Sequence, residues 1–142
     1  MKRIVACIIF SILGSIQMNG QNVFGKWKTF NQENGNVNSI IKIYKDGDEV
    51  KGKVVRIIKE EDRDRVCENC DGEMKDKPIE GLVILRGLHK DGDEYTGGVV
   101  TDPKSGKEYK CKIWLDNENP DQLNIRGYIA FFYKTQTWER LD

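Results

Sequence analysis

Gly25-Lys26-Trp27 and Trp138-Glu139-Arg140 are the two short stretches that decide the fold. They stand at opposite ends of the chain, and between them strand-forming runs alternate with turn residues. Strands that follow one another through short hairpins pair antiparallel. The two motifs therefore predict the closure of a small antiparallel β-barrel, and they indicate a fold without indicating a chemistry.

The chain from the first motif to the last contains about eight strand-like runs, most with the period of two that a half-buried strand shows, while residues 79–88 are more continuously apolar. In one of them Tyr109, Cys111 and Ile113 alternate with Lys110 and Lys112. The predicted strands are residues 23–30, 39–44, 50–58, 79–88, 94–101, 108–115, 122–128 and 131–141. Turn sequences such as Asp-Gly separate them, so the simplest topology is an all-β, up-and-down barrel of about eight strands.

One segment of the chain recurs. Residues 44–55 and 89–100 match at eight of twelve positions and share the sequence Lys-Asp-Gly-Asp-Glu. A calcium loop of the EF-hand type needs further oxygen ligands and a late glutamate that neither copy supplies. The repeat therefore predicts two equivalent hairpin turns, with Gly52 and Gly97 marking matching bends in the strands that follow.

The first twenty residues have the pattern of a secretory signal peptide. Met1-Lys2-Arg3 is basic, and residues 4–16 are an apolar run that is too short to span a bilayer. We expect cleavage between Gln17 and Asn22, one domain over residues 21–142, and a periplasmic or secreted protein without a membrane span. A lipid anchor at Cys7 is the alternative, but no apolar run precedes that cysteine.

Charge gives little indication of a partner. Removing Lys2 and Arg3 leaves 21 Lys+Arg against 23 Asp+Glu, a mature net charge of −2. This balance favours neither nucleic acid nor an anionic membrane as a partner. The sequence also contains no phosphate loop, no nucleophile paired with a base and no full set of metal ligands, so we predict no enzyme activity, no cofactor and no metal.

Residues 59–78 form a long connection in which thirteen of twenty residues are charged. Loops of this length act as lids or binding loops, or are mobile. In an exported protein, Cys67 and Cys70 within it predict a local disulfide. A thiolate metal site would need two more ligands, for which only Cys111 and His89 remain, and Cys111 belongs to a predicted core strand. A redox role lacks a helix after Cys70 to stabilise a thiolate.

The ordered set of motifs resembles a bacterial family called domain of unknown function 2147. The resemblance rests on Gly25-Lys26-Trp27, residues 78–85 (PIEGLVIL), residues 102–109 (DPKSGKEY) and residues 126–140, and it covers essentially the whole mature chain. It implies an exported, lipocalin-like barrel whose biochemical role is not established. This chain has residues 66–72 (VCENCDG) where other members have an Asn-Pro-Asp type segment.

The resemblance also implies roles for the residues of the terminal motifs. In lipocalin-like barrels the Gly-x-Trp indole packs across the closed end, and a basic side chain of the last strand covers it. Here Gly25, Trp27, Trp138 and Arg140 would form that closure, with a cation–π contact between Trp27 and Arg140. A contact between Trp27 and a ligand is the alternative role for this indole.

Two arginines are in register with apolar residues of their strands. Arg56 is in phase with Val54 and Ile58, and Arg86 with Ile84 and Leu88. Inward arginines could hold an anionic ligand group, whereas a strand end, an acidic partner or a bulge would give them a structural role.

The leading functional hypothesis is a binding protein for a small hydrophobic or amphipathic ligand, including an anionic one or a lipid. Its candidate contacts are Trp27, Arg56, Arg86 and Tyr95. The alternative is a packed, non-enzymatic module that docks a protein partner through the charged loop of residues 59–78, because eight-stranded barrels can be either hollow or filled.

Overall fold

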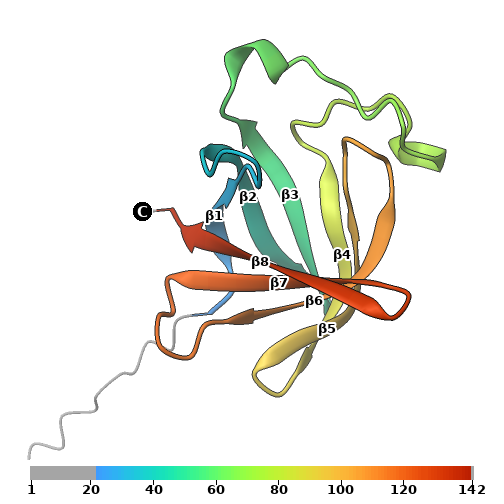
Figure 1. Cartoon of the computed structure of the whole chain (residues 1–142). Helices are drawn as coiled ribbons and strands as arrows, with labels where there is room; N and C mark the ends of the chain where they lie inside the picture. The colour runs from blue at the N-terminus through green and yellow to red at the C-terminus, as the bar shows by residue number, and fades with distance from the viewer. Residues whose placement is uncertain (1–21, 142) are drawn as a thin grey trace, which may run out of the picture.

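The structure is a computed structural model that describes residues 22–141. The predicted signal peptide and Cys7 lie outside the described residues. Eight antiparallel strands close into one barrel and follow each other around it in chain order (Figure 1). The strands are β1 (Gly25–Phe30), β2 (Val37–Asp46), β3 (Glu49–Ile57), β4 (Val83–Asp91), β5 (Glu94–Thr101), β6 (Glu108–Leu115), β7 (Gln122–Ile129) and β8 (Phe132–Arg140). The predicted fold class is confirmed.

The repeated segment forms two hairpin turns, as predicted. Asp46 pairs with Glu49 and Asp91 pairs with Glu94, so each turn has two central residues. Gly47 has a φ of 63° and Gly92 a φ of 61°. This left-handed backbone is the conformation that tight hairpin turns require and that glycine adopts without strain.

Strand β4 begins four residues later than the sequence predicts. Residues 79–82 form a turn in which the Leu82 N–H donates to the Ile79 carbonyl at 3.0 Å. Gly81 has a φ of 90°, which removes this residue from regular strand geometry. The Glu80 carboxylate accepts a hydrogen bond from the Ile57 N–H at 2.9 Å and so fastens the turn to the end of β3.

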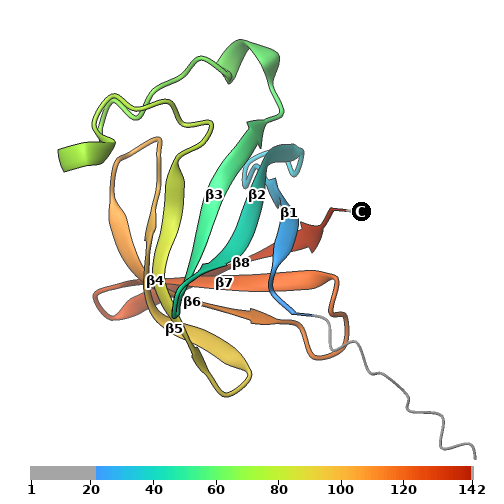
Figure 2. The same ribbon diagram turned by 180° about the vertical axis from the view of Figure 1, so that it is seen from behind.

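The barrel closes through a short seam. β1 and β8 pair only at Trp27 with Arg140 and Lys28 with Glu139. In the view from behind, β7 and β8 run together away from this seam toward their common turn (Figure 2). The half of β8 that is nearer this turn therefore has no partner in β1.

The core occupies the closed end and the middle of the barrel. Its most deeply buried side chains are those of Trp27, Ile41, Ile43, Leu85, Leu88, Ile113 and Leu123. Within residues 22–141, no helix has the length and apolar character needed to cross a membrane.

Candidate functional site

The two ends of the barrel are built differently. The connections β1–β2, β3–β4, β5–β6 and β7–β8 meet at one end, because successive hairpins of an up-and-down barrel alternate between its ends. This end, which we call the mouth, opens into a cavity of about 600 Å³. Ligand sites for small molecules typically have volumes of roughly 300–1,000 Å³.

Apolar side chains from most of the strands line the interior of the cavity. This lining includes Ile41, Val54, Ile57, Ile79, Ile84, Val100, Tyr109, Ile125 and Trp138. All of them except Ile79, which lies in the turn before β4, come from inward positions of the strands. An apolar wall of this kind suits a hydrocarbon or aromatic group and offers few hydrogen-bond partners to a sugar or a nucleotide.

Polar and charged side chains surround the rim, and only some of the charged ones have a partner. The rim includes Asn31, Gln32, Glu33, Asp62, Arg65, Asp102, Lys104 and Lys134. Asp62 pairs with Arg65 at 3.1 Å. Asp102 accepts hydrogen bonds from the Lys104 N–H and the Ser105 hydroxyl, both at 3.0 Å, within its own turn. Within the described part of the chain, Lys104 and Lys134 make no ion pair and are the free cations of the rim.

The opposite end is closed by Trp27 and Arg140. The Trp27 side chain is fully buried, and its indole N–H donates to the Val23 carbonyl at 2.9 Å. The guanidinium carbon of Arg140 lies 4.3 Å from the centroid of the Trp27 ring. Arg140 also donates to the carbonyls of Phe24 at 3.3 Å and Asn22 at 2.9 Å, so it ties the start of the described chain to β8.

Gly25 and Trp138 occupy different parts of this architecture. Gly25 has a φ of 118°, and a Cβ atom there would lie 3.8 Å from Arg140 Nη1. Trp138, which is opposite Leu123 in the sheet, is buried and faces the cavity. Trp138 therefore contributes to the interior wall, while Gly25, Trp27 and Arg140 meet at the closed end.

None of the four candidate ligand contacts lines the cavity. Trp27 belongs to the closed end, and Tyr95 packs edge-to-face against Phe24 with ring centroids 6.2 Å apart. Arg56 is exposed, so the expectation that it faces inward is wrong. Its register shifts because Ile40 pairs with Arg56 while Ile41 pairs with Val54, which leaves Val55 as the extra residue of a β-bulge.

Arg86 faces outward for a similar reason. Gly52 pairs with Leu85 and Lys53 with Val83, so the pairing shifts just before Arg86. Arg86 lies opposite Val99, which lies opposite the exposed Lys110, and directly opposite residues share a face. Its guanidinium forms an ion pair with Glu108 and donates to the Thr101 hydroxyl at 3.0 Å.

The connection of residues 59–78 is folded. It contains two 3-10 turns, η1 (Glu60–Asp62) and η2 (Gly72–Met74), and a bridge between Val66 and Pro78. Cys67 and Cys70 form a disulfide and are both buried. The predicted disulfide is thus present, and its two cysteines are the buried residues of a segment whose other side chains are mostly exposed.

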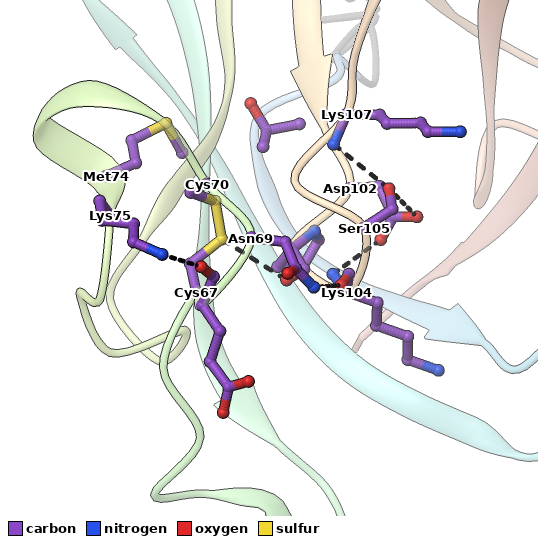
Figure 3. Close-up of a disulfide and its surroundings, with 12 residues drawn as sticks. Cys67, Asn69, Cys70, Met74, Lys75, Asp102, Lys104, Ser105 and Lys107 are labelled. Carbon is purple, nitrogen blue, oxygen red and sulfur yellow. Dashed lines mark hydrogen bonds between the residues drawn. A yellow bond between two sulfur atoms is a disulfide. The ribbon is translucent and has the colours of Figure 1, made fainter.

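The disulfide segment rests on the β5–β6 turn (Figure 3). The Asn69 side-chain amide donates to the Lys104 carbonyl at 2.8 Å. A Cβ atom on Gly106 would lie only 1.8 Å from the Asn69 carbonyl oxygen, so glycine permits this approach. A second hollow of about 480 Å³ lies between the two segments, with Asn69, Asp71 and Lys107 among its lining residues.

The remaining cysteine and histidine do not approach the disulfide. Cys111 is buried in β6, where desolvation raises the pKa of its thiol to about 12, although Arg86 acts in the opposite direction. His89 is exposed at the closed end, where its Nδ1 lies 3.0 Å from the Asp48 carbonyl oxygen. In residues 22–141 no three Cys, His, Asp or Glu side chains are grouped so that they could hold a metal ion.

The alternation of apolar residues already marks Ile41, Val54 and Ile125 as inward, but it does not say whether they touch each other or border a cavity. Sequence reasoning instead selected aromatic and basic residues as ligand contacts. The rim lysines Lys104 and Lys134 were missed, because a lysine in or beside a turn looks like any solvated surface charge.

A closed eight-stranded antiparallel barrel with an apolar cavity defines a lipocalin-like protein. This chain is similar to the solved structure titled "Protein HP1028 from the human pathogen Helicobacter pylori belongs to the lipocalin family". The TM-score is 0.72, and the sequence identity is 17% over 85% of this chain and 84% of that chain. This likeness shows the fold. A search of curated proteins finds no match.

The family is shown by the sequence itself. Residues 25–140 match the family described as "Uncharacterized protein conserved in bacteria (DUF2147)". The chain belongs to this family, as the ordered motifs predict. The match begins at Gly25 and ends at Arg140, the two residues that meet at the closed end of the barrel.

Proposed function

We propose that this protein binds a small amphipathic molecule in the barrel, with the apolar part of the ligand in the cavity and an anionic group at the rim. The observation that carries the proposal is the cavity of about 600 Å³, lined by apolar side chains and open at one end. A barrel filled by its own side chains would leave no such space.

The rim supports an anionic head group. Asp62 and Asp102 are engaged by Arg65 and by their own turn, whereas Lys104 and Lys134 make no ion pair in the described region. A carboxylate or phosphate at the mouth would meet these two lysines, while the rim carboxylates Glu33 and Asp102 also make no ion pair within the described residues. This position replaces Arg56 and Arg86 as the predicted anion contacts, since both of those side chains lie outside the cavity.

The geometry favours a binding protein over an enzyme. A cavity with an apolar wall and a charged rim can sequester and orient an amphipathic molecule. Hydrolysis or transfer would need a nucleophile or a base within reach of the bound molecule. The Cys111 thiol has a pKa raised to about 12, which keeps it protonated and a poor nucleophile near neutral pH.

Export to the periplasm or the medium remains part of the proposal. It is supported by the basic and apolar pattern of residues 1–20 and by the disulfide between Cys67 and Cys70, because structural disulfides persist in oxidising compartments. Fractionation of the native host, with detection of the shortened chain outside the cytoplasm, tests this part independently of ligand binding.

A matched pair of variants tests the binding site. Val100 lines the cavity, and its neighbour Val99 lies on the opposite face of the same strand. We expect Val100→Trp to fill part of the cavity and to weaken binding of a fluorescent fatty acid such as cis-parinaric acid by about tenfold or more, a loss of at least about 1.4 kcal/mol. Val99→Trp should leave the affinity unchanged. Equal affinities for both variants, or no binding by the parent protein, would contradict the proposal.

A further inference from the structure

The turn between β7 and β8 carries the most exposed apolar side chains of the described structure. Phe131 is fully exposed at 100%, Phe132 at 76%, Tyr133 at 62%, Ile129 at 53% and Tyr128 at 37%. Single exposed apolar residues are ordinary, but five within six consecutive positions form a patch that calls for an explanation.

The patch is a projecting tip rather than part of the barrel wall. Successive strand residues point to opposite faces, and Phe132 and Tyr133 are both exposed, so both faces of the hairpin are exposed next to the turn. Figure 1 shows β7 and β8 reaching this turn together, away from the seam with β1. Ala130 has a φ of 49°, an uncommon conformation for a residue other than glycine.

The strand backbone next to the turn is hydrogen-bonded, and the two tyrosines are the aromatic residues of the tip that carry a polar group. Tyr128 pairs with Tyr133 and Ile129 pairs with Phe132, so the strand backbone is paired up to the last residues before the turn. The two tyrosines combine an apolar ring with a hydroxyl, and their pair lies one step farther from the turn than the pair of Ile129 and Phe132. Tyrosine in this position suits the boundary between a hydrocarbon phase and water.

The flanks of the tip are basic. Residues 125–137 contain Arg126 and Lys134 and no carboxylate. Lys110 of the neighbouring strand lies directly opposite Tyr128. Arg126 is held in place by stacking on Tyr133, with its guanidinium carbon 4.1 Å from the ring centroid. The balanced charge of the whole chain thus conceals a local region of positive charge immediately behind the aromatic residues.

We propose that the β7–β8 tip, residues 128–133, docks the protein on an anionic lipid surface. Phe131 and Phe132 enter the interfacial region, and Arg126, Lys134 and Lys110 lie against lipid phosphates. The basic charge supports lipid over a second copy of this chain, since two such tips would repel each other.

This docking would place the mouth of the barrel at the lipid surface. Ile129 and Lys134 belong to the tip region and also line the cavity. An amphipathic molecule could therefore pass between the lipid layer and the barrel without crossing much water. The docking itself does not depend on the cavity being filled, so loss of lipid docking and loss of ligand binding are separate results.

Flotation of the purified protein with lipid vesicles tests the proposal. We expect the protein to float with vesicles of phosphatidylglycerol and phosphatidylcholine in equal parts, and to float poorly with phosphatidylcholine alone. Phe131→Ser/Phe132→Ser should reduce the vesicle-bound fraction by about tenfold. Ile58→Ser/Leu141→Ser removes two partly exposed apolar side chains elsewhere and should bind like the parent protein.

The thermal midpoint and the far-UV spectrum of each variant establish that the barrel is intact, because the two phenylalanines contribute little buried surface. Three results would overturn the proposal: no flotation of the parent protein, equal flotation of the phenylalanine variant, or a concentration-dependent dimer that the phenylalanine variant abolishes while the parent ignores vesicles. The last result would assign the tip to self-association.

Discussion

The closed end and the mouth of this barrel use similar residues for opposite purposes. At the closed end an aromatic ring, Trp27, is fully buried under Arg140, and the guanidinium is further fixed by backbone carbonyls. At the mouth the aromatic rings of Phe131 and Phe132 are exposed, and nearby cations stand free in the described structure. The first arrangement holds the fold together, and the second is available to a ligand or a surface.

The largest expected effect concerns Trp27. Replacing it by alanine removes a fully buried indole, so we expect Trp27→Ala to lower the free energy of unfolding by about 3–5 kcal/mol. Trp114 is the matched control, because it is partly exposed and stacks against Arg126 on the outer face. Urea denaturation followed by circular dichroism compares the two, and equal losses would break the distinction between the closed end and the rest of the barrel.

Loss of the disulfide should affect the mouth more than the barrel. We expect Cys67→Ser/Cys70→Ser to lower the free energy of unfolding by at most about 2 kcal/mol, because the bond closes a very short loop. Limited proteolysis should cut residues 59–78 faster in the variant, while the strands stay resistant. A segment that resists cleavage as well as the parent does would show that its contacts, rather than the bond, hold it in place.

A smaller and more local effect concerns the contact between residues 66–78 and the β5–β6 turn. Two glycine variants distinguish the loss of this contact from the backbone strain of a turn. Gly106 and Gly35 both have a φ of 73°, but only Gly106 is approached closely by a neighbour, the Asn69 carbonyl. We expect both alanine variants to lose about 1–2 kcal/mol through backbone strain, because an L-residue is strained in the left-handed conformation. Gly106→Ala should in addition release residues 66–78, measured as faster amide hydrogen exchange there. Identical exchange in the two variants would contradict the docked arrangement.

The smallest effect concerns Cys111 and appears only at alkaline pH. The buried Cys111 thiol has a pKa of about 12 against an ordinary value of 9.0, so the folded state holds this proton more tightly than the unfolded state. Its contribution to stability is complete below about pH 9 and is lost as the pH rises toward 12. Urea midpoints measured from about pH 8 to about pH 10.5 should fall less steeply for Cys111→Ala than for the parent protein. Parallel slopes would contradict a buried, protonated thiol.

The sequence predicted the fold well because its signals are local. Glu94–Thr101 and Glu108–Leu115 have the predicted bounds, since turn residues flank both strands and strict alternation marks the second. The family resemblance added which residues close the barrel and how they pack, which no local pattern could specify. The disulfide followed from the spacing of Cys67 and Cys70 in a protein with a predicted signal peptide.

The site was harder to predict because it depends on register. Arg56 and Arg86 share the alternation of their apolar neighbours, and a shift of one residue at a bulge turns each to the other face. Nothing in the sequence marks either bulge. The cavity is also a property of the assembled wall, because the same isoleucines and valines could equally fill a narrower barrel.

Native mass spectrometry of the protein purified from its own host tests the central claim, that the mouth admits an amphipathic ligand, most directly. The account predicts a complex whose extra mass is released on denaturation as a small molecule with an apolar part and an acidic group. A mass equal to that of the polypeptide less the two protons of its disulfide, together with no uptake of added fatty acid, would contradict it and would favour a partner-docking module instead.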